Sequence, residues 1–114
     1  QAVVVDGWIH VSGQVALRDG KVVGHGNAAA QARQSFANIE TVLKSAGASL
    51  ADVVKLTCFL TSKDAYGGYA EVKNTLFADN PPASTTVIVS GLLLPDLLME
   101  IEAVARAPAG ATDA

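Results

Sequence analysis

The chain has 114 residues, half of them hydrophobic, which is enough for one domain with a buried core. Its formal net charge is −3, with eight Lys and Arg against eleven Asp and Glu, which argues against binding to DNA or RNA. The single cysteine excludes an intrachain disulfide and a multi-cysteine zinc site, and no apolar run reaches the roughly 20 residues needed to cross a membrane. No secretory signal stands at the start, so we expect a cytoplasmic protein without DNA or membrane partners.

The first segments of the chain are typical of strands. Residues 2–5 and 8–12 flank Asp6-Gly7, a pair that favours the positive φ angles of a two-residue hairpin turn. Residues 21–23, which follow Asp19-Gly20, are predicted to form a short third strand.

A helix is predicted from Asn27, a good N-cap, to Gly47, a good C-terminal stop. Its apolar residues recur at steps of three and four and form one stripe, namely Ala29, Ala32, Phe36, Ile39, Leu43 and Ala46. Residues 53–61 are predicted to form a strand. Its better core face is made by Val54, Leu56, Cys58 and Leu60.

A second helix is predicted from Asp64, which can cap it, to about Phe77. Its apolar stripe consists of Tyr66, Tyr69, Val72, Leu76 and Phe77. Gly67 and Gly68 weaken this helix by roughly 1 kcal/mol each relative to Ala.

Two strand-forming runs, residues 81–89 and 97–105, flank a turn marked by Gly91 and Pro95 and are predicted to form a hairpin. In the second run Leu97, Met99, Ile101, Ala103 and Ala105 point one way, and Leu98, Glu100, Glu102 and Val104 point the other. A face with two carboxylates does not rest wholly on an apolar core, so it must meet water, a partner chain or a ligand.

The predicted order is therefore β-β-β-α-β-α-β-β, an α+β domain over residues 1–107 with a flexible tail over residues 108–114. Each helix has one apolar stripe, so both should pack on the same face of a single sheet. The other face then lacks cover from its own chain, which predicts a homo-oligomer.

Several motifs, in order and over nearly the whole chain, resemble the RidA/YjgF family, also called the endoribonuclease L-PSP or translation-initiation-inhibitor family. They are Gln1-Ala2-Val3, Val11-Ser12-Gly13-Gln14, Asn38-Ile39, Ala46-Gly47-Ala48-Ser49, Val53-Val54-Lys55, Pro82-Ala83 and the run from Glu100 to Ala105. The resemblance implies a chorismate-mutase-like subunit that assembles into a homotrimer, with clefts between the subunits. It further implies hydrolysis of reactive imines or enamines, which releases ammonia and a 2-keto acid without a metal or organic cofactor.

The family's substrate-binding arginine follows the Pro-Ala pair, and this chain has Ser84 there. A position that is often cysteine in the family is Thr86, and the family's asparagine and tyrosine on the second helix correspond to Ala70 and Lys73. The tyrosine of the family's Gly-Pro-Tyr-Ser segment would precede Gln1.

The resemblance leaves Glu100 as the candidate catalytic residue, which would position a water molecule or move a proton. The backbone of Ser12 and Gly13 would hold a ligand oxygen, and Ser84 and Thr86 would line the cleft. Two structural alternatives stay open. Glu100 could be an ordinary sheet glutamate paired with Lys55 or Arg106, and the hydroxyl residues could reflect strand propensity and turn chemistry.

Other polar residues have ordinary explanations in the sequence. Lys73 is either a replacement cation or a solvated helix lysine, and Cys58, in the middle of an apolar strand face, is predicted to be an inert thiol. His10 and His25 do not show a metal or triad spacing.

Three hypotheses for function follow. The first is a RidA-like hydrolase with an altered substrate or reduced activity, because serine does not replace a guanidinium that grips a carboxylate. The second is a non-catalytic trimer that binds a metabolite or a protein. The third is an endoribonuclease or translation inhibitor, which the acidic balance of the chain disfavours.

Overall fold

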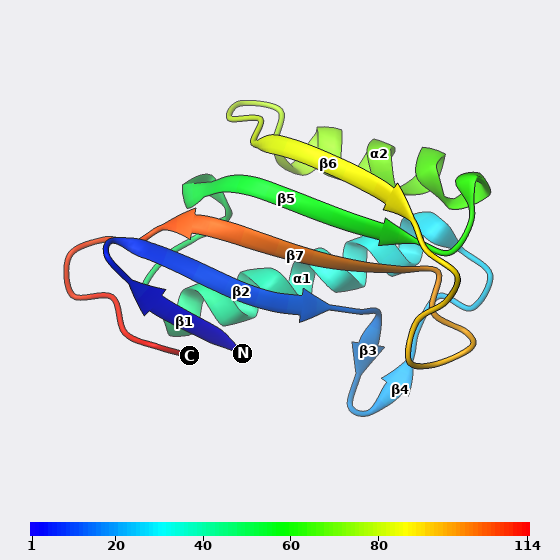
Figure 1. Cartoon of the computed structure of the whole chain (residues 1–114), viewed down its shortest axis with the longest axis horizontal. Coiled ribbons are helices and arrows are strands. Elements are labelled where there is room, and N and C mark those ends of the chain that lie inside the picture. Colours follow the sequence, from blue (N-terminus) through cyan, green and yellow to red (C-terminus); the bar gives the residue numbers. More distant parts are fainter.

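Two helices cover one face of a five-stranded mixed sheet in the computed structural model, which describes all 114 residues (Figure 1). The large sheet contains β1 (Ala2–Val5), β2 (Trp8–Gln14), β5 (Val53–Leu60), β6 (Ala83–Ile88) and β7 (Met99–Arg106). A separate small sheet contains β3 (Leu17–Arg18) and β4 (Lys21–Val22). The helices are α1 (Ala28–Ser45) and α2 (Tyr66–Leu76). The predicted α+β architecture, with both helices on one sheet face, is confirmed.

The predicted N-terminal hairpin is confirmed, and both residues of its turn have the expected positive φ, 49° at Asp6 and 83° at Gly7. The third predicted strand does not join the large sheet. Instead β4 pairs with β3 across a second turn of the same kind, in which φ is 52° at Asp19 and 77° at Gly20.

The predicted C-terminal hairpin is wrong. The strand order is β1-β2-β7-β5-β6, so β7 lies between β2 and β5 and does not pair with β6. Strand β6 is an edge strand that pairs in parallel with β5, because the chain returns to the sheet through α2. Strand β7 pairs antiparallel with both of its neighbours.

Helix α1 agrees with the prediction at both ends. The side chain of Asn27 accepts a hydrogen bond of 2.9 Å from the Ala30 N–H, and Gly47 follows the helix with a φ of 90°. In β5 the predicted core face fails at its start, because the register with β7 shifts between Val53 and Lys55. Val53 is consequently buried and Val54 is only half-buried.

The start of α2 differs from the prediction. A single 3-10 turn over Lys63–Ala65 precedes the helix, and the residue whose side chain caps it is Ser62, which accepts a hydrogen bond of 3.1 Å from the Asp64 N–H. The predicted stripe is correct at Tyr69, Val72 and Phe77, which are buried, but Tyr66 and Leu76 are exposed.

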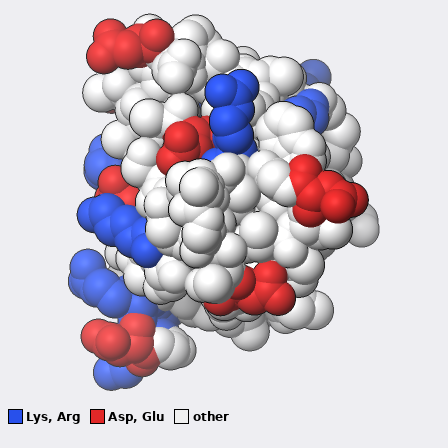
Figure 2. Space-filling view, turned by 90° about the vertical axis from the view of Figure 1, so that its left-hand side faces the viewer, with Lys and Arg blue, Asp and Glu red and all other residues white.

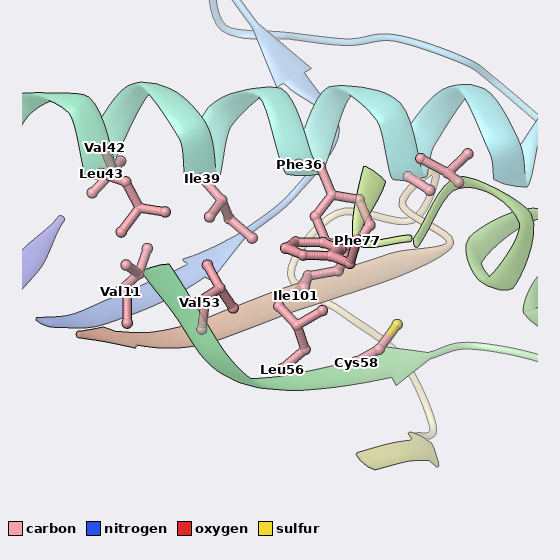
Figure 3. Close-up of a cluster of buried hydrophobic side chains, with 14 of the residues drawn as sticks. Val11, Phe36, Ile39, Val42, Leu43, Val53, Leu56, Cys58, Phe77 and Ile101 are labelled. Carbon is pink, nitrogen blue, oxygen red and sulfur yellow. The ribbon is translucent and has the colours of Figure 1, made fainter. Parts of the chain in front are cut away.

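The core lies between α1 and the sheet and continues under α2 (Figure 3). Phe36 is at its centre, with its ring centroid 5.6 Å from that of Phe77 in an edge-to-face arrangement and 6.0 Å from that of Tyr69 in a stacked one. Strand β7 supplies its predicted apolar face, because Met99, Ile101 and alternate residues after them are buried.

Gln31 is a buried polar residue that ties α1 to the segment before β7. Its side-chain amide donates hydrogen bonds to the carbonyl oxygens of Asp96 (2.9 Å) and Gly24 (3.2 Å), and its oxygen accepts one of 2.8 Å from the Leu98 N–H. This single residue thus satisfies backbone groups of two loops.

Replacing Gln31 by Met should lower the free energy of unfolding by about 1–3 kcal/mol, because the Leu98 N–H loses its acceptor in a partly buried place. Urea denaturation measures this change. Gln34→Met is the matched control, since its amide bonds only to the Asn38 side chain, and we expect a change within about 0.5 kcal/mol. Equal stabilities of the two variants would contradict the role assigned to Gln31.

The last residues of the chain run beside β1, and both termini lie close together (Figure 1). The Ala2 N–H donates to the Ala114 carbonyl (2.6 Å), the Ala114 N–H donates to the Ala2 carbonyl (3.2 Å), and the Val4 N–H donates to the Asp113 carboxylate. The flexibility expected of residues 108–114 stays a prediction, and hydrogen exchange of the Ala114 amide would measure it.

The sheet face opposite the helices has no cover from its own chain (Figure 1). By strand register this open face carries Val3, Val5, Trp8, His10, Lys55, Thr57, Phe59, Glu100, Glu102, Val104, Thr85 and Val87. Thr86 and Ile88 of β6 point to the helix side, because they pair with Cys58 and Leu60.

Candidate functional site

A β-bulge in β2 brings together three of the residues that the sequence singled out. Val11 pairs with Ala103 and Gln14 pairs with Ile101, so one extra residue is inserted in β2 at Ser12-Gly13. The side chain of Glu100 folds over this bulge. A Cβ on Gly13 would lie 2.7 Å from Cδ and 2.9 Å from Cγ of Glu100, so a larger residue at position 13 would require the Glu100 side chain to move.

Ser12 contributes to this bulge in a different way from the prediction. Its N–H donates a hydrogen bond of 2.8 Å to the carbonyl of Gln1 and is therefore occupied within the chain. The side chain of Gln14 donates to the Ser12 carbonyl (3.0 Å) and to the Gln1 side chain (2.8 Å). Ser12 is exposed, so its hydroxyl is the group that a ligand can reach.

Glu100 does not form an ion pair within the chain. The single ion pair joins His25 Nδ1 and Asp96 Oδ2 at 3.8 Å, and the Lys55 ammonium donates to the Thr85 hydroxyl instead. The alternative in which Lys55 or Arg106 neutralises Glu100 is therefore not seen. The bulge group, which we define as Ser12, Gly13 and Glu100, presents a half-buried carboxylate on the open sheet face.

Ser84 and Thr86 lie elsewhere in the chain. They are on β6, where they pair with Leu56 and Cys58 and so face the helix side of the sheet. Ser84 is exposed and Thr86 is half-buried, because β6 is the edge strand. The chain therefore does not bring the two halves of the predicted site together, since they lie on opposite faces of the sheet with β5 between β7 and β6.

Tyr69 of α2 lies close to Ser84 and Thr86, and we call these three residues the hydroxyl cluster. Burial raises the pKa of the Tyr69 phenol to about 12, although the nearby hydroxyls of Ser84 and Thr86 act in the opposite direction. The Tyr69 hydroxyl is fully buried, and no atom lies in hydrogen-bonding geometry with it. Sequence reasoning treated Tyr69 only as a core residue, but a tyrosine on a buried stripe needs a polar partner, and that requirement was the available signal.

Two further groups border this site. Lys73 places its ammonium 5.9 Å from the centroid of the Tyr69 ring. Burial raises the pKa of the Cys58 thiol to about 12, with the positive charge of Lys73 opposing the shift. Cys58 is fully buried and protonated at neutral pH, in keeping with the predicted inert thiol.

A family model and several relatives match nearly the whole chain. Residues 1–107 match the model of the family described as endoribonuclease L-PSP. A RutC family protein of Pyrococcus abyssi is 37% identical over 107 residues, which cover 92% of this chain and 83% of the relative. The 2-iminobutanoate/2-iminopropanoate deaminase of Rattus norvegicus is 37% identical over 107 residues, which cover 92% of this chain and 77% of the relative.

The solved structures agree with the sequence relatives. The crystal structure of a member of the YjgF/YER057c/UK114 family from Mycobacterium tuberculosis superposes with a TM-score of 0.82 at 34% identity, covering 93% of this chain and 84% of that one. Fold and site define a small α+β domain with a carboxylate at a β-bulge on an uncovered sheet face. The chain belongs to the endoribonuclease L-PSP family, which is the RidA/YjgF family that its motifs resemble.

Two broader findings concern the whole chain. None of its helices is both long and apolar enough to cross a membrane. Three or more His, Cys, Asp or Glu side chains are nowhere close enough together to bind a metal ion.

Proposed function

We propose that this protein is a RidA-like hydrolase that acts on a small reactive imine or enamine in a cleft between subunits. The observation that carries the proposal is the Glu100 carboxylate, which lies over the Gly13 bulge without an ion pair and on a sheet face that its own chain leaves open. The similarity to the rat 2-iminobutanoate/2-iminopropanoate deaminase supports the reaction class.

In this proposal Glu100 orients a water molecule toward the carbon of the C=N bond. The water oxygen forms the new bond to that carbon while the carboxylate accepts one proton from the water and passes it to the nitrogen, which gives a carbinolamine. The carboxylate then accepts the hydroxyl proton of the carbinolamine and passes it to the nitrogen, the C–N bond breaks with its electron pair leaving on ammonia, and the C=O bond forms. Imine and water thereby become a carbonyl compound and ammonia, with atoms and charge balanced. An enamine enters the same sequence after a proton is added to its carbon.

The complete site requires more than one copy of the chain in this proposal. The bulge group and the hydroxyl cluster lie on opposite faces of one sheet, so a single ligand does not touch both within one chain. The open face carries exposed apolar side chains, among them Val3, Val5 and Trp8. Burial of this face in a homotrimer would remove apolar surface from water and bring the bulge group of one copy toward the hydroxyl cluster of the next.

Ser84 sets the expected level of activity. An arginine at this position would hold a substrate carboxylate through two charge-assisted hydrogen bonds, each of which contributes about 1.5–3 kcal/mol. Serine lacks both, so we expect anionic substrates to bind roughly a hundredfold more weakly than with arginine.

The test is ammonia release from a panel of 2-imino acids and neutral imines by the purified protein and by Ser84→Arg. We expect measurable acceleration by the native protein and a higher kcat/KM for Ser84→Arg on the 2-imino acids alone, by about a hundredfold. The neutral imines are the internal control. Failure of both proteins to accelerate any reaction in the panel would overturn the hydrolase proposal.

The endoribonuclease activity in the family's name receives less support. On the face shown in Figure 2, basic and acidic side chains are interspersed, most of the surface is uncharged, and no continuous basic stripe is visible. Phosphate recognition needs such a stripe, and the formal net charge of this chain is −3.

A further inference from the structure

We propose that Lys73 is a binding residue which supplies the positive charge for a small carboxylate-bearing ligand at the hydroxyl cluster of Tyr69, Ser84 and Thr86. The inference deepens the proposed function, on which it rests for the choice of ligand. It assigns the charge that Ser84 does not provide to a residue of α2.

The hydroxyl cluster contains one hydroxyl, that of Tyr69, whose hydrogen-bonding capacity is not used. The Tyr69 hydroxyl is fully buried, has no partner in suitable geometry, and is close to the hydroxyls of Ser84 and Thr86. A buried donor without a partner costs about 1–3 kcal/mol, so a ligand oxygen that accepts from it would recover that cost. Ser84, whose hydroxyl is close to that of Tyr69, is exposed on the edge strand.

The positive charge of Lys73 lies beside the hydroxyl cluster without a partner of opposite charge. The Lys73 ammonium lies 5.9 Å from the centroid of the Tyr69 ring, and its positive charge acts on Cys58 of β5. No carboxylate lies within 4.0 Å of it, because the single ion pair of the chain is that of His25 and Asp96. Lys73 is half-buried, so its charge is less screened by water than that of a fully exposed lysine.

There is also space beside this charge. A hollow of about 200 Å³ borders Lys73 and is lined also by Asn74, Phe77, Ala78, Pro81 and Pro82, immediately before β6 begins. Its volume is below the roughly 300–1,000 Å³ of pockets for drug-sized ligands. The hollow borders Lys73 but is not lined by Tyr69, Ser84 or Thr86, and a ligand that fits beside Lys73 is therefore small.

The chemistry of the cluster selects a carboxylate. One ammonium and three hydroxyls are all hydrogen-bond donors, and they suit an anionic group with two acceptor oxygens. Lysine acts as a point charge and lacks the bidentate fork of arginine, so it holds a carboxylate with less geometric restraint. A short 2-imino acid, or the 2-keto acid formed from it, fits both the charge and the space.

The test measures binding of 2-oxobutanoate and its neutral amide by calorimetry to the native protein, Lys73→Met, Lys73→Arg and Lys63→Met. We expect Lys73→Met to weaken 2-oxobutanoate binding by at least about tenfold while leaving the amide unchanged, and Lys73→Arg to restore it. Lys63→Met is the matched control, because Lys63 is exposed in the turn before α2, and it should bind as the native protein does.

The outcomes separate this inference from the hydrolase proposal. Lysine-dependent binding of 2-oxobutanoate without ammonia release from any imine would support the inference and overturn the hydrolysis. Ammonia release from 2-imino acids with the same KM in the native protein and Lys73→Met would overturn the inference and keep the hydrolysis. Equal binding of 2-oxobutanoate by the native protein and Lys73→Met, with unchanged melting temperatures, would also overturn the inference.

Discussion

Replacing Glu100 by Gln should reduce the rate of ammonia release by at least about a hundredfold. The amide keeps the size of the side chain over the Gly13 bulge but does not accept a proton, and a positioned general acid–base group contributes about 10²–10⁴ in rate. The loss should appear in kcat, with KM changed by no more than about threefold, because substrate contacts other than proton transfer persist. Steady-state kinetics on the best imine of the panel measures both constants.

The sequence supplies a matched control for this variant. Glu102 lies on the same strand and the same face of the sheet, is exposed, and has no assigned role. Glu102→Gln should keep at least about half of the native rate, since Glu102 is not part of the bulge group. Equal rates for Glu100→Gln and the native protein would remove Glu100 from the mechanism.

The second large effect concerns the contact between α1 and α2. A Cβ on Gly68 would lie 2.6 Å from the nitrogen of Ala29 and 2.8 Å from the Cβ of Ala28, whereas a Cβ on Gly67 meets nothing within 4 Å. Gly68→Ala should destabilise the fold by about 1–3 kcal/mol, because the backbone of α1 must move. Gly67→Ala should stabilise it by up to about 1 kcal/mol through helix propensity.

The two glycine variants control for each other, because they make the same chemical change one residue apart in the same helix. Urea denaturation of both should show a difference of about 1–4 kcal/mol, with the native protein between them. If both variants gained stability, the close approach of the helices at Gly68 would be wrong.

Local patterns in the sequence were sufficient for the elements whose partners are near in the chain. The Asp6-Gly7 turn, the cap at Asn27 and the alternation of β7 all depend on residues within a few positions of each other, and the structure confirms them. The pairing of β6 was different. Nothing local distinguishes a hairpin with β7 from a parallel pair with β5, because that choice depends on where α2 leads the chain.

The candidate site shows the same division. Gly13 and Glu100 were each named as candidate site residues from the family resemblance, but their contact with each other is a property of the bulge in the β2–β7 register. The two halves of the site are separated because the side chains of Ser84 and Thr86 point to the helix side of the sheet. The predicted hairpin of β6 with β7 was wrong, so it did not reveal this orientation. Gln31 was missed because a polar residue beside an apolar stripe usually meets water, and here loops from distant segments cover it.

The central place of β7 has a consequence for the order of folding during synthesis. The β1–β2 hairpin and the β5–α2–β6 unit share no strand pairing, and only β7, which is synthesised after both of them, fills the gap between them. Until it arrives, β2 and β5 each present an unpaired edge to neighbouring nascent chains. The sheet therefore assembles as a late, cooperative event, and premature termination before residue 99 would yield aggregation-prone fragments instead of a smaller stable domain.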